Sequence, residues 1–166
     1  ERFYEPTEGA IHANTTDIKD LPMNGWRSAV GFVPQEAHLF TGTIAENIAY
    51  GRPTASQEEI TDAARRVGAL HAIAAIPGGF NARIGERGRG LSSGQRQLVA
   101  LARAEMIHPQ LLLLDEATAT LDPATEKTIV AASNRVTQAR TAVVVAHRLA
   151  TARRADLILV VSDGVF

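Results

Sequence analysis

The chain has 166 residues, a length typical of one globular domain, and 45% of them are hydrophobic, as expected of a chain that buries a core. Its net charge is -1, so no broad electrostatic field attracts nucleic acid or an anionic membrane surface. Cysteine is absent, which excludes disulfides, thiolate zinc sites and thiol nucleophiles, and no apolar run approaches the roughly 20 residues of a membrane-spanning helix.

The first strand signal is the run AVGFV, residues 29–33. It is rich in residues that favour strands, and Pro34 closes it because proline has no N–H to donate to a central ladder. Gln35 therefore lies just past the end of a predicted strand.

The next part of the chain favours helices. Ser56 and Glu59 have the spacing of a capping box, which predicts a helix that continues through Val67. The charged, glycine-rich stretch GERGRG, residues 85–90, predicts a solvent-facing loop. We therefore expect a mostly helical insert over residues 38–104, with few strand signals.

A second helix and strand follow the glycine-rich loop. Ser92 is a suitable N-cap for a helix with one apolar face that ends before Pro109. The leucine run at 111–114 is short and apolar on both faces, which is typical of a central parallel strand. It ends abruptly on two adjacent carboxylates, Asp115 and Glu116.

The remaining residues predict helix, strand, helix and strand in turn. Asp122, followed by proline, is expected to start a helix that runs to about Arg135. Residues 141–146 have the composition of a fully buried strand that His147 ends, and residues 157–161 that of another buried strand. This alternation predicts an α/β fold with an open, mostly parallel sheet.

Four polar residues follow these predicted strands: Gln35, Asp115, Glu116 and His147. Gln35 and His147 alone are each more often surface or capping residues, and two adjacent carboxylates are about equally often a solvated turn or helix start, but parallel sheets bind ligands at the carboxyl ends of their strands. There, Asp115 can hold magnesium and Glu116 can accept a proton from an attacking water. Gln35 can orient that water, and His147 can donate to a phosphate oxygen. Together they predict a site for phosphoryl transfer.

Ser92, Ser93 and Gly94 offer hydroxyl and backbone donors at a helix start, where the positive end of the helix dipole favours anions. The alternative is an ordinary capped helix start. The usual phosphate cradle, GxxxxGK[ST], needs a lysine after a glycine, and the two lysines of the chain, Lys19 and Lys127, do not follow one. The sequence therefore predicts a phosphate site without its own cradle.

Five motifs in this order resemble those of the ATP-binding cassette (ABC) ATPases. LSSGQ, residues 91–95, resembles the family's signature, LLLLDE, residues 111–116, its Walker B strand, and TLD, residues 120–122, its D-loop. Gln35 lies where the Q-loop glutamine falls, and His147 where the switch histidine falls. The resemblance covers essentially the whole chain, beginning just after the place of the Walker A helix.

Two stretches resemble exporter-type cassettes in particular. These are FTGTIAENIAYG, residues 40–51, and the loop that includes residues 84–88, which in such cassettes contacts the intracellular loops of the transmembrane domains. The resemblance implies a P-loop NTPase-like fold in three parts. Residues 1–37 would be partial core with the Q-loop, residues 38–104 the helical subdomain with the signature, and residues 105–166 core with Walker B, D-loop and switch histidine.

The family implies a role for each matching residue, with ATP and Mg²⁺ as cofactors. Glu116 would be the general base, and Asp115 would bind magnesium through water. Gln35 would bridge the metal site and the coupling surface, and His147 would contact the γ-phosphate.

The signature residues Ser92, Ser93, Gly94 and Gln95 would close on ATP held by a second cassette, so the family implies a head-to-tail pair across which Asp122 signals. Ser93 replaces the glycine usual at its position and adds a hydroxyl. The other implied partners are transmembrane domains, with no nucleic acid, at the cytoplasmic face of the cell membrane.

We therefore expect a C-terminal fragment of the ATP-hydrolysing domain of an exporter, inactive alone because Walker A is missing. One alternative is a non-transport cassette of the chromosome-maintenance type, although that type separates Q-loop and signature by a long coiled coil, and no sustained heptads occur here. The other is a non-catalytic module that supplies LSSGQ in trans. Because apolar sheet surface would be exposed, we also expect the chain to self-associate or rearrange.

Overall fold

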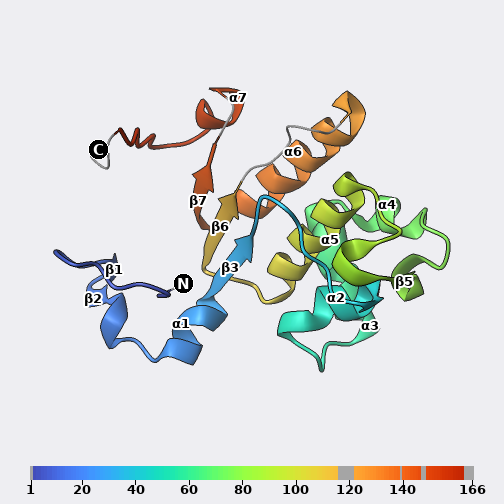
Figure 1. Ribbon diagram of the computed structural model, residues 1–166, viewed down its shortest axis with the longest axis horizontal. Helices are drawn as coiled ribbons and strands as arrows, with labels where there is room; N and C mark the ends of the chain where they lie inside the picture. Colours follow the sequence, from blue (N-terminus) through green and yellow to red (C-terminus); the bar gives the residue numbers. More distant parts are fainter. Residues whose placement is uncertain (1, 116–121, 139, 147–148, 163–166) are drawn as a thin grey trace.

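The computed structural model describes residues 2–115, 122–138, 140–146 and 149–162. They form an α/β structure in which a three-stranded parallel sheet is flanked by helices (Figure 1). In chain order, the strands, α-helices and 3₁₀ helices (η) are β1 (His12–Ala13), β2 (Thr16–Asp17), η1 (Ile18–Asp20), α1 (Met23–Ala29), β3 (Val30–Val33), β4 (Gly42–Thr43), α2 (Ile44–Ile48), η2 (Ala49–Gly51), α3 (Gln57–Val67), α4 (Leu70–Ala74), η3 (Gly79–Asn81), β5 (Arg83–Ile84), η4 (Glu86–Gly88), α5 (Ser93–Met106), β6 (Leu111–Asp115), α6 (Pro123–Thr137), β7 (Thr141–Val145) and α7 (Leu149–Ala152).

The main sheet has the strand order β3-β6-β7, and both pairings are parallel. The leucine strand β6 is central, as the sequence predicted, because its side chains are apolar on both faces. Its first residue, Leu111, pairs with Val30 of β3 and with Thr141 of β7. Strand β3 ends at Val33, directly before Pro34, which confirms that the proline closes this strand.

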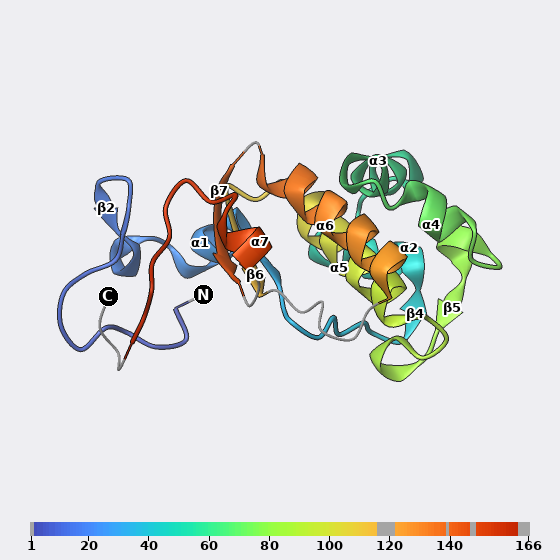
Figure 2. The ribbon, with the colours of Figure 1, turned by 90° about the horizontal axis from the view of Figure 1, so that it is seen from above.

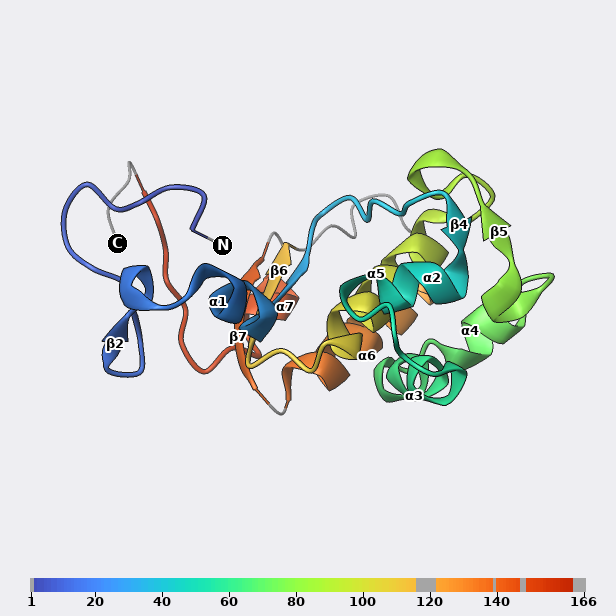
Figure 3. The same ribbon diagram turned by 90° about the horizontal axis from the view of Figure 1, so that it is seen from below.

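The helices α2 to α6 lie on one side of this sheet, whereas the β1–β2 hairpin lies on the other (Figures 2 and 3). Helix α5 is the centre of the helical part, because it packs against α2, α3 and α6 and also contacts β3. Its buried apolar residues join those of the sheet in one core cluster. A small antiparallel pair, β4–β5, also lies in the region that we expected to be mostly helical.

Local capping signals set the starts of the helices. The Ser56 hydroxyl accepts a hydrogen bond from the Glu59 N–H (3.2 Å), and the Glu59 carboxylate accepts one from the Ser56 N–H (2.7 Å), so the predicted capping box of α3 is confirmed. Helix α3 ends at Val67, also as predicted, and Gly68 follows in the left-handed conformation (φ +78°) that favours glycine.

Two predictions about strands were wrong. Residues 141–146 were expected to form a fully buried strand, but β7 is an edge strand that pairs with β6 alone among the described strands, and Val143 is 54% exposed. Residues 157–161 were expected to form another buried strand, but they form none and every side chain is more than half exposed. This segment leads away from β7 (Figure 1), and no described strand pairs with it. Apolar composition alone does not produce a strand, because a strand also needs a neighbour with which to form hydrogen bonds.

In the part of the chain that the structure describes, no helix is both long and apolar enough to cross a membrane.

Candidate functional site

The structure brings Gln35 and Asp115 to the same edge of the main sheet. Asp115 is the last residue of β6, and Gln35 follows two residues after Val33, the last residue of β3. These strands are parallel neighbours with Val33 opposite Leu114, so both polar residues lie at the carboxyl ends of adjacent strands. Asp115 is half-buried and Gln35 is exposed, which leaves the amide accessible from outside.

Glu116 and His147, the predicted general base and phosphate contact, lie outside the described residues. Within the described ranges, no group of three or more histidine, aspartate or glutamate side chains could hold a metal ion. The described donors of this edge, the Asp115 carboxylate and the Gln35 amide, are nonetheless oxygen ligands of the type that Mg²⁺ prefers.

The first turn of α5 contains the predicted signature residues, and its capping box determines which backbone groups stay available. The Ser92 hydroxyl accepts a hydrogen bond from the Gln95 N–H (3.2 Å), and Gln95 Oε1 accepts one from the Ser92 N–H (2.9 Å). A helix start leaves four N–H groups without partners inside the helix. The box satisfies two, so the N–H groups of Ser93 and Gly94 have no partner in the described part of the chain.

Gly94 is buried because α5 packs against α6 at this point. A methyl group added to Gly94 would overlap the methyl group of Thr125, in the first turn of α6. The close approach therefore requires glycine at position 94, and it places the N-termini of α5 and α6 side by side. The sequence indicates Gly94 as part of a helix start, but it gives no sign of Thr125, since nothing local in the sequence connects the two.

Asp122 is the N-cap of α6, as predicted. Its Oδ1 atom accepts hydrogen bonds from the N–H groups of Ala124 (3.1 Å) and Thr125 (3.0 Å). Hydrogen bonds from Thr125 first, and then from Ala124, hold the pKa of this exposed carboxyl below its usual value. Asp122 is therefore ionised at neutral pH, and part of its hydrogen-bonding capacity is used within α6.

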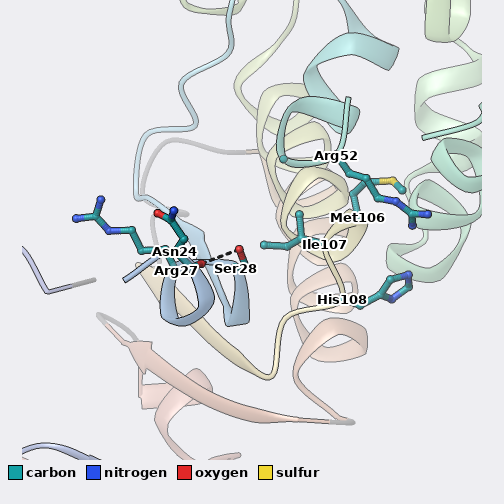
Figure 4. A pocket seen from close by; sticks show the side chains of 8 residues that line it. Asn24, Arg27, Ser28, Arg52, Met106, Ile107 and His108 are labelled. Carbon is teal, nitrogen blue, oxygen red and sulfur yellow. Dashed lines mark hydrogen bonds between the residues drawn. The ribbon is translucent and has the colours of Figure 1, made fainter. Parts of the chain in front are cut away.

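A cleft of about 480 Å³ lies elsewhere, between α1 and the end of α5 (Figure 4). Arg27 and Arg52 line it, but they point to opposite sides of the view. The Arg27 guanidinium lies over the Phe3 ring (5.3 Å), and Arg52 forms an ion pair with Glu59 (2.6 Å). These arginines have partners and do not converge, so the cleft is a weaker candidate for the functional site than the strand edge and the helix starts.

Comparison with known proteins decides the family. A sequence profile described as "ABC transporter" matches residues 1–119, well over half of the chain. The chain belongs to the ABC transporter family. This confirms the family that the LSSGQ and LLLLDE motifs indicated.

Its relatives include transporters from several kingdoms. It is 46% identical over 164 residues to "ABC transporter B family member 2" of Dictyostelium discoideum, covering 99% of this chain and 12% of that protein. It is 45% identical over 163 residues to "Multidrug efflux ATP-binding/permease protein" of Mycobacterium bovis, covering 98% and 14%.

The fold matches that of exporter-type members of the ABC family. The structure of a bacterial Atm1-family ABC exporter with ATP bound superimposes with a TM-score of 0.87 and 44% identity, covering 98% of this chain and 28% of that chain. The predicted fold class is therefore confirmed. This ABC chain spans between about an eighth and about a quarter of the lengths of these relatives.

Proposed function

We propose that this chain is part of the ATP-binding and ATP-hydrolysing domain of an exporter-type ABC transporter, which couples ATP hydrolysis to the export of a substrate across a membrane. Residues 1–37 and 105–166 contribute to the nucleotide-binding core, and residues 38–104 form the helical subdomain. The similarity to a multidrug efflux permease and to an exporter with ATP bound supports this proposal.

The observation that carries the proposal is the pair of N–H groups at Ser93 and Gly94, which have no hydrogen-bond partner among the described residues. They lie at the start of a 14-residue helix, where the helix dipole adds positive potential, and the exposed Ser93 hydroxyl lies beside them. These are donors of the kind that a triphosphate needs, and no described residue accepts a hydrogen bond from them once Ser92 and Gln95 have capped the helix. The residues present therefore fit a phosphate group.

The edge formed by β3 and β6 supplies the reactive groups in this proposal. Asp115 would hold Mg²⁺ through water, and Gln35 would connect this metal with the outer surface. Glu116 accepts the proton of the attacking water, and His147 donates a hydrogen bond to the γ-phosphate. When bound, Mg²⁺ neutralises charge on the phosphate oxygens.

The signature residues act on ATP that a second cassette presents. In this proposal two cassettes pair head to tail, so the Ser93 and Gly94 donors of one subunit complete the site of the other, and Asp122 communicates across the pair. Residues 84–88 face the transmembrane domains of the transporter, so the chain acts at the cytoplasmic face of the membrane. Nucleic acid is not among its proposed partners.

An exporter graft tests the proposal. In the graft, residues 1–166 replace the matching segment of the Atm1-family exporter, which is 44% identical over nearly all of this chain. We expect Mg²⁺-dependent ATP hydrolysis, and we expect Glu116→Gln to lower its rate by at least about 100-fold while the graft still traps ATP, since the general base acts only in the chemical step. A folded graft without hydrolysis, or one that Glu116→Gln leaves unchanged, contradicts the proposal.

A second candidate function is a non-catalytic module that supplies LSSGQ in trans. It is favoured by one observation, namely that the 166 residues contain no GxxxxGK[ST]. Adding the chain itself to a cassette whose signature has been inactivated distinguishes the two: restored hydrolysis supports the module, and no effect counts against it.

A further inference from the structure

Arg103 on α5 makes a set of long-range contacts that the proposed function does not use. Its Nε donates to the Asn47 carbonyl oxygen (2.9 Å), one terminal nitrogen donates to Asn47 Oδ1 (2.8 Å), and the other donates to the His38 carbonyl oxygen (2.9 Å). The partners lie 56 and 65 residues earlier in the chain. One guanidinium group therefore attaches α5 to the segment 38–47.

The surroundings of Arg103 hold it in this position. Its guanidinium carbon lies 5.3 Å from the centre of the Phe40 ring and 5.9 Å from that of Tyr50, and these two rings are stacked on each other. Burial lowers the pKa of Arg103, although an arginine stays charged at any physiological pH. Among the described residues no carboxylate forms an ion pair with it, so carbonyl oxygens and aromatic faces stabilise the charge.

Asn47 extends the contact further into the segment. It is 2% exposed, its Oδ1 accepts a hydrogen bond from the Phe40 N–H (2.9 Å), and its side-chain amide donates to the carbonyl oxygens of Phe40 (2.9 Å) and Thr43 (3.0 Å). Arg103 and Asn47 thus fix the shape of residues 38–47 as well as their attachment to α5.

We propose that Arg103 is a positioning residue that fixes the segment after Gln35 relative to the signature helix. Gln35 lies three residues before His38, and Ser93 begins the helix that carries Arg103. Arg103 therefore joins the segment that begins three residues after Gln35 to the helix whose first turn holds the phosphate donors. This inference rests on the proposed function, because only there do both parts act on one nucleotide.

Hydrogen exchange on the 166-residue chain tests the attachment without reference to activity. Arg103→Lys keeps the charge, but a single ammonium group cannot reach all three acceptors. We expect the Phe40 amide to exchange about tenfold faster, with the amides of α6 changed less than about twofold. Arg65→Lys, an exposed arginine on α3, is the matched control and is expected to change neither.

ATP hydrolysis by the exporter graft tests the positioning role. We expect Arg103→Lys to lower kcat by about tenfold with KM for ATP within about twofold, because misplacement affects the assembled site more than ground-state binding. Asn47→Ala, which acts from the other side of the contact, is expected to have a similar effect. The double variant is then expected to lose no more than the stronger single variant, since both changes break one connection.

The outcomes separate this inference from the proposed function. If Arg103→Lys affects exchange and kcat no more than Arg65→Lys, or if it raises exchange throughout the chain and lowers the melting temperature as kcat falls, the positioning role is overturned. A wild-type graft without ATP hydrolysis overturns the proposed function and with it the catalytic role of Arg103. Faster exchange confined to residues 38–47 still supports the attachment in that case.

Discussion

Gly94, in the first turn of α5, packs so closely against Thr125, in the first turn of α6, that any side chain at position 94 would overlap the threonine methyl group. This contact brings two helix N-termini together. In one, the N–H groups of Ser93 and Gly94 have no partner in the part of the chain that the structure describes, and the other is capped by the ionised Asp122. The glycine of the signature thus has a packing role inside this chain as well as its proposed role toward a nucleotide.

Replacing Gly94 with alanine is therefore expected to destabilise the fold by about 1–3 kcal/mol, because overpacking forces neighbouring helices apart. Thr125→Ser removes the methyl group that the new side chain meets, so the double variant is expected to recover most of this loss. Urea unfolding of the four proteins measures both values. Additive losses in the double variant would show that the two residues are not in contact.

Glu105 gives a second prediction about stability. Its carboxylate is 4% exposed and forms ion pairs with Arg66 of α3 (2.8 Å) and with Arg140, just before β7 (2.9 Å). Glu105→Ala removes the carboxylate that both ion pairs share, which we expect to cost about 2–4 kcal/mol, a value discounted because Arg66 is about 41% exposed to solvent. Glu58→Ala, an exposed glutamate on α3, is the control for urea unfolding, and an equal loss in both would contradict a role for the buried pair.

Stability is also expected to fall in acid because of the helix caps. Hydrogen bonds from Thr125 lower the pKa of Asp122, and the backbone N–H groups of Ser56 and Thr43 lower those of Glu59 and Glu46. A carboxyl whose pKa is lower in the folded than in the unfolded state stabilises the fold above its unfolded pKa. This contribution is complete above about pH 5 and is lost as the pH falls through about 4 and below.

Unfolding by urea at pH 7, 5 and 3.5 measures this dependence. Glu59→Gln is expected to lose less stability between pH 5 and 3.5 than the wild-type chain, since one of the titrating groups is gone. Parallel losses in the two proteins would rule out a contribution from this cap.

The exposed edge of the sheet predicts self-association of the chain. Val143 and Val145 are 54% and 52% exposed on β7, which has no described partner on its outer side, and unpaired apolar edges pair with other chains. We expect the apparent mass in light scattering to rise with concentration and Val143→Lys to reduce this rise. Ala131→Lys, which adds the same charge on an exposed position of α6, is the control. A monomer at every concentration would contradict the prediction.

Local signals made much of the fold predictable. The Ser56–Glu59 box, the Asp122 cap and the apolar strand β6 are each encoded within a few residues, and all three occur as predicted. The order of strands and helices then predicted the parallel sheet, and hence that Gln35 and Asp115 would share one edge.

Other features depend on contacts between distant residues, which no local pattern reveals. The attachment of Arg103 to His38 spans 65 residues, and the contact of Gly94 with Thr125 joins two helices. The error at residues 157–161 has the same origin, because burial depends on which neighbours a segment has as well as on its apolar composition.

The central claim is that the α5 start of one subunit acts on a nucleotide held by another. Two variants of the exporter graft test it when co-expressed. Glu116→Gln removes the proposed base but keeps the signature, and Ser93→Asp keeps the base but places a negative charge, which a helix start tolerates, beside the phosphate donors.

The decisive measurement is the ATP hydrolysis rate of the co-expressed pair. Each variant alone is expected to be inactive, whereas random pairing produces mixed dimers in which one site combines an intact base with an intact signature. Half of the dimers are then mixed, and one of the two sites in each mixed dimer is intact. If the two sites act independently, we predict about a quarter of the unmodified graft's rate. A pair as inactive as either variant alone, in dimers shown to be mixed, would contradict it.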